Sequence, residues 1–333
     1  MVVPSYFFQK KKRGATFFSW RSLCPFCSPF NSCFTPRNSL QLLLSSTPHA
    51  HFSPSPLPMS ILRRLNLPIH LLHRNHYNRH VTTSAAASIH HEPAVWTTAP
   101  LSNVEPAAES LFHVTVDLSD SPDLAASHTR AGQYLRLRVP DVKWPTFLAI
   151  ASPPKLAQTH GAFEFLVKSV AGSTAEALCR LRRGDVVELS RVMGNGFDID
   201  RIDPPEKFNT VLIFATGSGI SSIRSLIESG FAARKRSDVR LYYGDTNLRR
   251  MAYLDRFNEW ESSGVKIVPV LFQPDDGWRG ERGYVQAAYT RAKQLSNPSS
   301  TGAVLCGQRQ MTEEITSILV ADGVSGDKIL KNF

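Results

Sequence analysis

Hydrophobic and polar residues alternate with a period of two through much of the segment between about Val95 and Ser190. In the stretch 133–139 the leucines and the valine fall on one side, and a tyrosine and two arginines fall on the other. That period is typical of β-strands with one buried face. Short strands separated by Pro, Gly and Asp turns predict an antiparallel β-barrel. The predicted strands are 111–118, 133–139, 147–150, 163–167 and 186–189, and one helix, 173–181, interrupts them.

The pattern changes after the proline-containing stretch 201–207, which we interpret as a linker. Beyond it, short apolar runs typical of buried parallel strands alternate with amphipathic helical segments. This alternation predicts an α/β doubly wound parallel sheet, whose ligand binds at the carboxyl ends of the strands. The predicted strands are 211–215, 239–243, 266–271, 303–306 and 328–330; the predicted helices begin near 220 and span 253–261, 285–295 and 311–319.

The unit 210–230 combines a strand, a glycine turn and a helix in the order that nucleotide sites use. Its apolar run is followed by Thr-Gly-Ser-Gly at 216–219, and Ile220 opens the apolar face of the helix. Free N–H groups of the turn and the positive end of the helix dipole converge where a phosphate can bind. Ser222 stands where a full dinucleotide fingerprint has its third glycine. We predict a nucleotide site here; the alternative is a tight turn that binds nothing.

The first 91 residues differ in composition from the rest of the chain. They contain no Asp or Glu, are rich in Arg, Ser, Thr, Pro and Leu, and account for the whole net charge of +10. This composition is typical of a transit peptide, so we expect residues 1–91 to be a transit peptide or a disordered leader. The Ser/Thr/Ala-rich end favours a chloroplast address, and the Arg-Arg segment after Met59 suits a mitochondrion as the alternative. Translation can start at Met1 or at Met59.

Several function classes are not expected from the composition. The segment after residue 91 carries equal numbers of acidic and basic side chains, which gives no electrostatic reason to expect nucleic acid as a partner. The leucine cluster 40–44 is too short to span a bilayer, so we expect no transmembrane segment. Cys24, Cys27 and Cys33 and the histidines at 70–80 fall in the predicted leader. Because a leader has no packed shell to hold ligands, we expect no metal site.

Four short sequence motifs in the chain resemble those of a known protein family. They are Thr-Gly-Ser-Gly-Ile at 216–220, Tyr-Gly-Asp-Thr at 243–246, Cys-Gly-Gln-Arg-Gln-Met at 306–311 and Gly-Asn-Gly-Phe at 194–197. With the barrel before the parallel sheet, they resemble the ferredoxin–NADP reductase-like superfamily, and more closely its plant fruit-protein branch. The resemblance implies a FAD-binding β-barrel of the Greek-key type at 92–203 and an NAD(P)-binding domain at 204–333.

The resemblance also implies site residues, with FAD and NAD(P)H as the cofactors. The implied FAD contacts are Leu148, Ala149, Ile150, Ala151, Ser152, Val167, Lys168, Gly172, Ser173, Thr174 and Ala175. The implied NAD(P) contacts are Thr216, Gly217, Ser218, Gly219, Ile220, Gly244, Asp245, Arg249, Gly307 and Gln308. The implied catalytic residues are Cys306, beside the nicotinamide, and Phe333, whose ring covers the flavin; a small buried thiol and a frayed terminus are the alternatives.

The coenzyme choice stays open at this point. Asp245 follows the second strand of the sheet, where an acid can bind the ribose 2′-hydroxyl and repel a 2′-phosphate, which favours NADH. Arg249 and Arg250 are predicted to open the next helix, and they can instead bind that phosphate.

The segment 146–152 departs from the family pattern. The family has Arg, Tyr and Ser where this chain has Thr146, Leu148 and Ala149, although the following Ile-Ala-Ser is intact. Losing a charge-assisted phosphate contact and a hydrogen bond weakens flavin binding by a few kcal/mol. We expect backbone donors at Ala149 and Ile150, and the helix N-terminus at 173–175, to retain the flavin.

The leading interpretation is a flavin-dependent oxidoreductase that takes hydride from NAD(P)H to FAD and passes electrons to an unidentified acceptor, a small protein or a small molecule. The alternative is a non-enzymatic nucleotide-binding or interaction protein that kept the fold and lost the flavin. The three departures at 146–149 favour this alternative.

Overall fold

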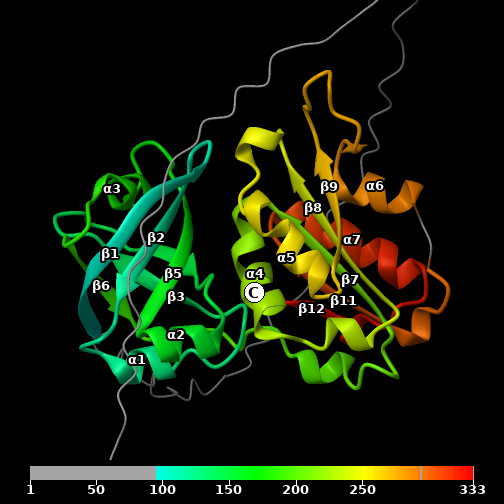
Figure 1. Cartoon of the computed structure of the whole chain (residues 1–333), viewed down its shortest axis with the longest axis horizontal. Coiled ribbons are helices and arrows are strands. Elements are labelled where there is room, and N and C mark those ends of the chain that lie inside the picture. Colours follow the sequence, from blue (N-terminus) through cyan, green and yellow to red (C-terminus); the bar gives the residue numbers. More distant parts are fainter. Residues whose placement is uncertain (1–94, 293–294, 333) are drawn as a thin grey trace, which may run out of the picture. The chain divides into compact units, whose positions relative to one another are not determined.

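The computed structural model describes residues 95–292 and 295–332 (Figure 1). The predicted leader, residues 1–91, and Phe333 lie outside the described residues. The described chain forms two six-stranded sheets, an antiparallel one followed by a parallel one. The predicted order of a barrel followed by a doubly wound sheet is therefore confirmed.

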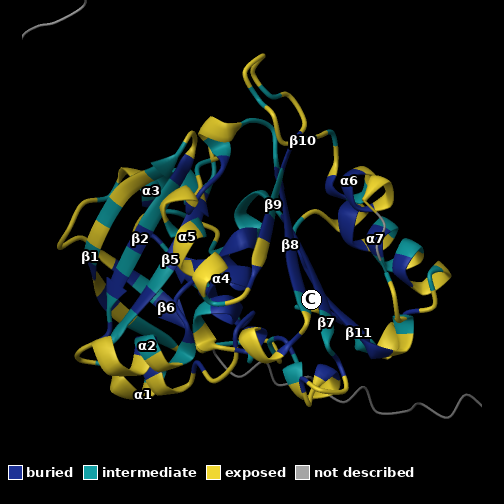
Figure 2. Cartoon of the chain, turned by 45° about the vertical axis from the view of Figure 1, so that its right-hand side comes forward, coloured by how far each residue is buried: buried dark blue, intermediate teal, exposed yellow. Residues whose placement is uncertain are grey.

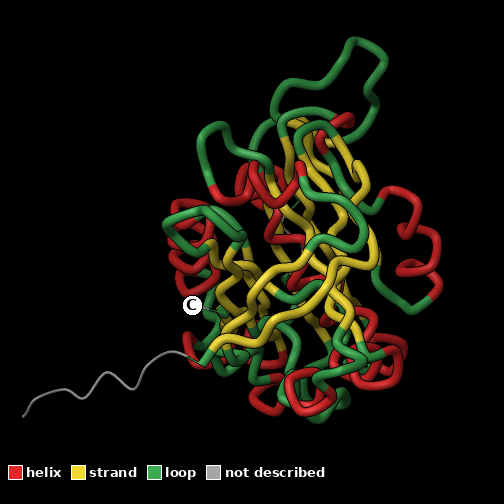
Figure 3. Tube along the Cα trace, turned by 90° about the vertical axis from the view of Figure 1, so that its left-hand side faces the viewer, coloured by secondary structure: helices red, strands yellow, loops and turns green. Residues whose placement is uncertain are grey.

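The antiparallel sheet closes into a barrel. Its strand order is β4-β3-β6-β1-β2-β5, and a bridge between Ile150 and Phe165 joins the end of β4 to β5. Figure 3 shows these strands curving around one core. Leu135 and Leu137 are fully buried in that core, as the period of two predicts. The strands are β1 (Trp96–Ala108), β2 (Leu111–Asp117), β3 (Tyr134–Arg138), β4 (Thr146–Ala149), β5 (Ala162–Lys168) and β6 (Val186–Ser190).

Three elements of the barrel domain were not predicted. Strand β1 contains Pro100 and Pro106, which argue against a strand. Pro106 lies beside a register shift in the pairing with β2, and Pro100 lies before the first residue that pairs with β2. Helices α1 (Pro122–Ala126) and α2 (Pro154–His160) begin at prolines that we interpreted as turn residues. Proline is favoured in the first turn of a helix, where its missing N–H has no intrahelical partner. The third helix, α3 (Thr174–Arg180), was predicted.

The parallel sheet has the order β10-β9-β8-β7-β11-β12 and carries helices on both faces. Its central strands are buried along their length (Figure 2). Ile213 packs with the helix α4 side of the sheet, and Phe214 packs with the α6 and α7 side. The strands are β7 (Thr210–Thr216), β8 (Asp238–Asp245), β9 (Lys266–Leu271), β10 (Glu281–Arg282), β11 (Thr301–Cys306) and β12 (Ile329–Lys331). The helices are α4 (Ile220–Ser229), α5 (Phe257–Ser262), α6 (Val285–Arg291) and α7 (Arg309–Ala321).

The helix predicted at 253–261 begins later than expected. Tyr253 has a left-handed backbone, with φ of 62°, so it cannot be a helical residue. A 3₁₀ turn at Leu254–Arg256 follows, and α5 begins at Phe257. Arg249 and Arg250 therefore do not open a helix, which corrects that prediction; they lie in the separate 3₁₀ turn Leu248–Arg250, whose N-cap is Asn247.

A buried arginine joins the two domains. Arg224 of α4 has a side chain that is only 4% exposed, and it pairs with Glu164 of β5 at 2.5 Å and with Glu228 at 3.1 Å. The hydroxyl of Ser225 also donates to the carbonyl of Ser152 in the barrel, at 3.0 Å. Because α4 starts directly after the glycine turn, these contacts fix the turn relative to the barrel.

Replacing Arg224 with Met is expected to lower the free energy of unfolding by about 2–3 kcal/mol, because two carboxylates lose their buried partner. The measurement is chemical denaturation followed by tryptophan fluorescence. Arg309→Met is the matched control, since Arg309 also pairs with a carboxylate, Glu313, but its side chain is 87% exposed. The control should leave the midpoint unchanged. Equal effects of the two substitutions would contradict a structural role for the buried pair.

Candidate functional site

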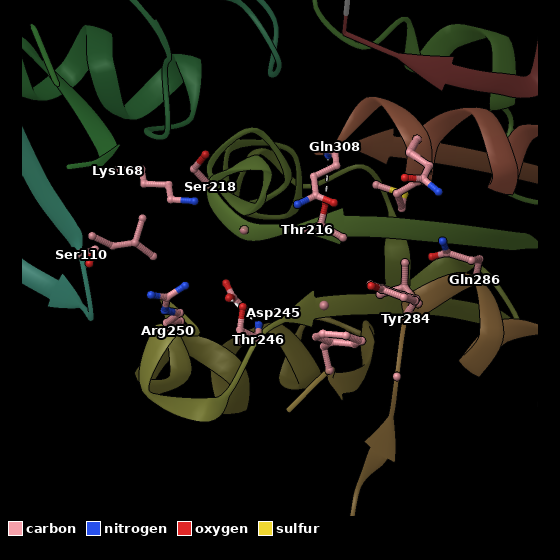
Figure 4. A pocket seen from close by; sticks show the side chains of 18 of the residues that line it. Ser110, Lys168, Thr216, Ser218, Asp245, Thr246, Arg250, Tyr284, Gln286 and Gln308 are labelled. Carbon is pink, nitrogen blue, oxygen red and sulfur yellow. Dashed lines mark hydrogen bonds between the residues drawn. The ribbon is translucent and has the colours of Figure 1, made fainter. Parts of the chain in front are cut away.

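A cavity of about 490 Å³ lies at the carboxyl ends of β7 and β8 (Figure 4). Its walls come from the glycine turn, the end of β8, the start of α6 and the turn before α7. The barrel adds a further wall, the β1–β2 turn, which contributes Glu109 and Ser110. This is where ligands bind in open parallel sheets, and the volume falls in the range of small-molecule sites.

The cavity brings together most, but not all, of the predicted nucleotide contacts. Those that line it are Thr216, Gly217, Ser218, Gly244, Asp245 and Gln308. Gly219, Ile220, Arg249 and Gly307 do not line it, and Ile220 is fully buried under the turn.

Gly219, a predicted nucleotide contact, has a packing role in this structure. A Cβ at this position would lie 2.5 Å from the carbonyl oxygen of Cys306. Glycine therefore lets the start of α4 pack directly against the end of β11. Ser218 is the better candidate for a residue that faces the phosphates, because it is half-exposed and lines the cavity.

The turn after β11 is held against the turn after β7. Gly307 has φ of 148°, and an added Cβ would clash with the hydroxyl of Thr216. The same hydroxyl accepts a hydrogen bond from the N–H of Gln308 at 3.0 Å (Figure 4). Thr216 and Gln308, which are 92 residues apart in the sequence, thus form one edge of the cavity. Gln308 reaches the cavity because Gly307 permits this close approach.

Asp245 faces the cavity together with four other charged residues, Glu109, Lys168, Arg250 and Glu314. Its carboxylate accepts a hydrogen bond from the N–H of Thr246 at 2.7 Å. Burial raises the pKa of Asp245, while that hydrogen bond and the charges of Arg250 and Lys168 act in the opposite direction. Lys168 lines the cavity as well, at the end of β5.

Of the two neighbouring arginines, Arg250 lines the cavity and Arg249 does not. Both are paired with Glu109 of the barrel: Arg250 at 3.3 Å, and Arg249 at 4.0 Å with a side chain that is 75% exposed. Glu109 therefore partly neutralises the only two cations that the sequence suggested for a 2′-phosphate.

Sequence reasoning missed an aromatic pair at the cavity. Phe272 and Tyr284 stack with ring centroids 4.7 Å apart and an interplanar angle of 18°. Both side chains are exposed and both line the cavity. Neither residue belongs to a sequence motif. The only feature of the sequence that could have indicated them is their position: Phe272 directly follows a predicted strand, and Tyr284 directly precedes a predicted helix. An exposed aromatic pair provides a stacking surface for a nucleotide base.

Cys306 ends β11 beneath the cavity and does not line it. Burial raises the pKa of its thiol to about 11, and hydrogen bonds with Ser222 and Asn332 act in the opposite direction. The thiol is therefore neutral at physiological pH. The Asn332 amide also donates to the Ser222 hydroxyl at 3.2 Å, so Ser222 holds the C-terminal segment beside Cys306. The other predicted catalytic residue, Phe333, lies outside the described residues.

Five of the predicted FAD contacts have buried side chains in this structure, and their contact with FAD stays a prediction. Their side chains are at most 8% exposed, because the pleat of the strands turns them into the barrel or its domain contact; they are Leu148, Ile150, Ala151, Ser152 and Val167. The N–H of Ile150 donates to the carbonyl of Gln133 at 3.0 Å, so this expected donor is engaged. The hydroxyl of Ser152 accepts from the N–H of Glu164.

The N-terminus of α3, which is predicted to bind a pyrophosphate, makes hydrogen bonds within the chain itself. Ser173 is its N-cap, as predicted, and accepts from the N–H of Glu176. The Glu176 carboxylate in turn accepts from the N–H of Gly172 at 2.8 Å, where a phosphate oxygen was expected. The hydroxyl of Thr174 donates to the carbonyl of Trp144. Ala175, the last of the predicted contacts here, is half-buried against the barrel core.

The outer face of the barrel offers a different fit to a flavin nucleotide. On β4 it is Phe147, not Leu148, that points outward, and its side chain is 65% exposed. Ala149 lies on the same face and is half-buried. On the adjacent strand, the Nε atom of Arg136 is buried and has no hydrogen-bond partner among the described residues. An orphaned guanidinium donor beside an exposed ring suits an anionic, planar cofactor.

The comparisons with known proteins agree with this architecture. The family model that describes the oxidoreductase NAD-binding domain matches residues 213–317. A ferredoxin NADP+ reductase from Neisseria gonorrhoeae, solved with bound FAD and NADP, aligns with a TM-score of 0.59 at 17% identity, over 72% of this chain and 99% of that one. The cytochrome b5 reductase domain of Ulva prolifera nitrate reductase aligns with a TM-score of 0.58 at 16% identity, over 71% and 97%.

The chain thus has the two-domain fold of ferredoxin–NADP reductase structures, and its residues 213–317 match the NAD-binding domain of oxidoreductases. The fruit protein pKIWI502 of Actinidia deliciosa is 47% identical over 291 residues, which is 84% of this chain and 90% of that protein. The chain belongs to the family of this fruit protein. A more distant relative, the sulfhydrogenase 1 subunit gamma of Pyrococcus furiosus, is 26% identical over 63% of this chain and 70% of that protein.

No group of three or more His, Cys, Asp or Glu side chains among the described residues can hold a metal ion. Within the same part of the chain, no helix has both the length and the apolar character needed to cross a bilayer.

Replacing Ser218 with Glu is expected to weaken binding of NADH and NADPH about 30-fold, or by about 2 kcal/mol, because the new carboxylate faces the phosphates. The fold should survive, since Ser218 is half-exposed. The measurement is titration of both coenzymes by fluorescence. Ser218→Gln, which has a similar volume and no charge, is the control. Unchanged affinity in the Glu variant would remove the pyrophosphate from this turn.

Proposed function

We propose that this protein takes hydride from a reduced pyridine nucleotide, with NADH preferred, to a bound FAD, and then passes electrons to a separate acceptor. The observation that carries the proposal is the cavity at the carboxyl ends of β7 and β8, which the barrel completes with Glu109 and Ser110. A nucleotide in this cavity touches both domains, as transfer to a cofactor on the barrel requires.

Different residues of the cavity bind different parts of the nucleotide. The backbone of 216–218 receives the pyrophosphate, Asp245 binds the ribose hydroxyls, and Phe272 with Tyr284 offers a surface to the adenine. Gln308 lies at the opposite edge, where the nicotinamide reaches the end of β11. The neutral Cys306 thiol adds no charge under this edge. FAD, when bound, supplies a two-electron acceptor that can release its electrons separately.

The names of the relatives indicate only the chemical class of the electron acceptor. The phenol 2-monooxygenase reductase component DmpP of Pseudomonas, 27% identical over 57% of this chain, is by its name the reductase component of a monooxygenase. We infer that this chain passes electrons to a small protein or a small molecule. Nucleic acid is not a partner in this proposal. The composition of residues 1–91 supports a chloroplast location, with the mitochondrion as the alternative.

A second candidate function has specific support. The missing side chains at Thr146, Leu148 and Ala149, and the engaged N-terminus of α3, favour a protein that binds the nucleotide but has lost the flavin. Such a protein retains the nucleotide cavity and has no acceptor for a hydride.

The purified full-length chain, dialysed against FAD and FMN, is expected to take up FAD and show a flavin absorbance band. Adding NADH without oxygen should bleach that band, because hydride transfer reduces the flavin. Heat-denatured protein is the control for non-specific uptake. An intact fold, seen by circular dichroism, that binds no FAD at tens of micromolar would exclude the oxidoreductase and favour the second candidate.

The coenzyme preference is expected to be at least about 10-fold in favour of NADH, or about 1.4 kcal/mol. Asp245 repels a 2′-phosphate, and Glu109 already engages the two arginines. Asp245→Ser should remove most of the difference, whereas Asp255→Ser, an exposed acid outside the cavity, should leave it unchanged. The measurement is titration of each variant with both coenzymes. Tighter binding of NADPH to the unmodified chain would show that Arg250 outweighs Asp245.

A further inference from the structure

Glu314 of α7 places a carboxylate in the wall of the nucleotide cavity. In the proposed function this cavity receives the pyrophosphate of the coenzyme, and two negative groups close together repel each other. The carboxylate is favourable there only if it faces a part of the ligand that carries hydrogen-bond donors. A pyridine nucleotide has such donors on its two riboses, on the adenine amino group and on the nicotinamide amide.

Two glutamine side chains fix the orientation of this carboxylate. The amide of Gln310, one helical turn earlier in α7, donates to Oε1 of Glu314 at 2.7 Å, and the amide of Gln286, at the start of α6, donates to Oε2 at 2.6 Å. These hydrogen bonds, that of Gln310 first, hold the pKa of Glu314 below its usual range, so the group is ionised at physiological pH. A carboxylate oxygen can accept more than one hydrogen bond. Glu314 is therefore a charged acceptor that is oriented before any ligand binds.

The carboxylate is tied to the end of the cavity that carries the aromatic pair. Tyr284 precedes Gln286 by two residues, and both line the cavity. Figure 4 shows these two side chains on one side of the cavity, with Asp245 and Arg250 on the other. The ring of Tyr284 stacks with that of Phe272, with centroids 4.7 Å apart. A base that stacks on this pair thus has its polar edge toward the segment that holds Gln286.

We propose that Glu314 selects the base of the coenzyme by accepting a hydrogen bond from the 6-amino group of adenine. This inference rests on the proposed function and deepens it, because it names the residue that distinguishes adenine from other bases. Asp245 binds the ribose hydroxyls, and Gln308 lies at the nicotinamide edge. The amino group of adenine is therefore the donor that remains at the aromatic end of the cavity.

The aromatic pair cannot make this selection by itself, because every base offers a flat face for stacking. The edge of the base carries the difference. A base with a carbonyl at position 6, such as hypoxanthine, places an oxygen against the carboxylate of Glu314, where no hydrogen bond can form. A site built to form a hydrogen bond discriminates strongly against a ligand that lacks the matching group. The cavity should therefore prefer adenine to hypoxanthine.

The test compares NADH with reduced nicotinamide hypoxanthine dinucleotide, in which a carbonyl replaces the adenine amino group. Binding of each to the full-length chain is measured by fluorescence titration. The unmodified chain is expected to bind NADH about 10- to 100-fold more tightly, the range of one hydrogen bond to a charged group. Glu314→Gln should weaken NADH and remove most of this difference, because an amide can donate to the carbonyl as well as accept from the amino group. Gln286→Leu should remove a smaller part, because the carboxylate keeps one of its two orienting bonds.

Glu313→Gln is the matched control. Glu313 precedes Glu314 on the same helix, but its side chain is 61% exposed, pairs with Arg309 and does not line the cavity. This variant should keep the preference of the unmodified chain. Phe272→Ala should weaken both coenzymes by similar factors, because the stacking surface does not distinguish the two bases.

The outcomes separate this inference from the proposed function. Equal affinity of the unmodified chain for the two coenzymes, or equal weakening of both by Glu314→Gln, would show that Glu314 does not select the base, and the proposed function would stand. Unchanged affinities in Phe272→Ala would place the base elsewhere and also overturn the inference. If the unmodified chain, folded by circular dichroism, binds neither coenzyme, both proposals fall.

Discussion

The buried contact of Arg224 with Glu164 and Glu228 is the constraint on which the rest of the structure depends. The arginine belongs to the helix that starts at the glycine turn, and Glu164 belongs to the barrel. Removing these three charges from water costs free energy, which their mutual attraction offsets only while they stay in contact. The cluster of Arg224, Glu164 and Glu228 therefore favours one arrangement of the two domains. The nucleotide cavity, which takes walls from both domains, exists because this arrangement is fixed.

The sequence was sufficient for the architecture because the signals were local. Periods of two and short apolar runs identified most strands, and the glycine turn at 216–219 identified the nucleotide end of the sheet. The elements that were missed, such as β1 with Pro106 inside it, depend on bulges that the pattern alone cannot reveal. The start of α5 was misplaced because the left-handed backbone of Tyr253 is set by tertiary packing.

The candidate site was harder to predict, for two physical reasons. Gly219 was interpreted as a phosphate contact, yet the atom that it must avoid is the carbonyl of Cys306, far away in the sequence. On β4, a family pattern placed Leu148 against the flavin, whereas the pleat places it inside the barrel and exposes Phe147. Arg136 belongs to no sequence motif. Only the structure shows that its Nε is buried and has no hydrogen-bond partner among the described residues.

The pairing of Glu109 with Arg249 and Arg250 has a consequence for how such two-domain reductases diversify. The charge that a coenzyme meets in the α/β domain is set in part by a turn of the barrel. Recombination that exchanges barrels between relatives would thus transmit a change of coenzyme along with the flavin domain, without a single substitution in the nucleotide-binding sheet. The two modules are separable in sequence and topology, but the charge that lines the cavity comes from both.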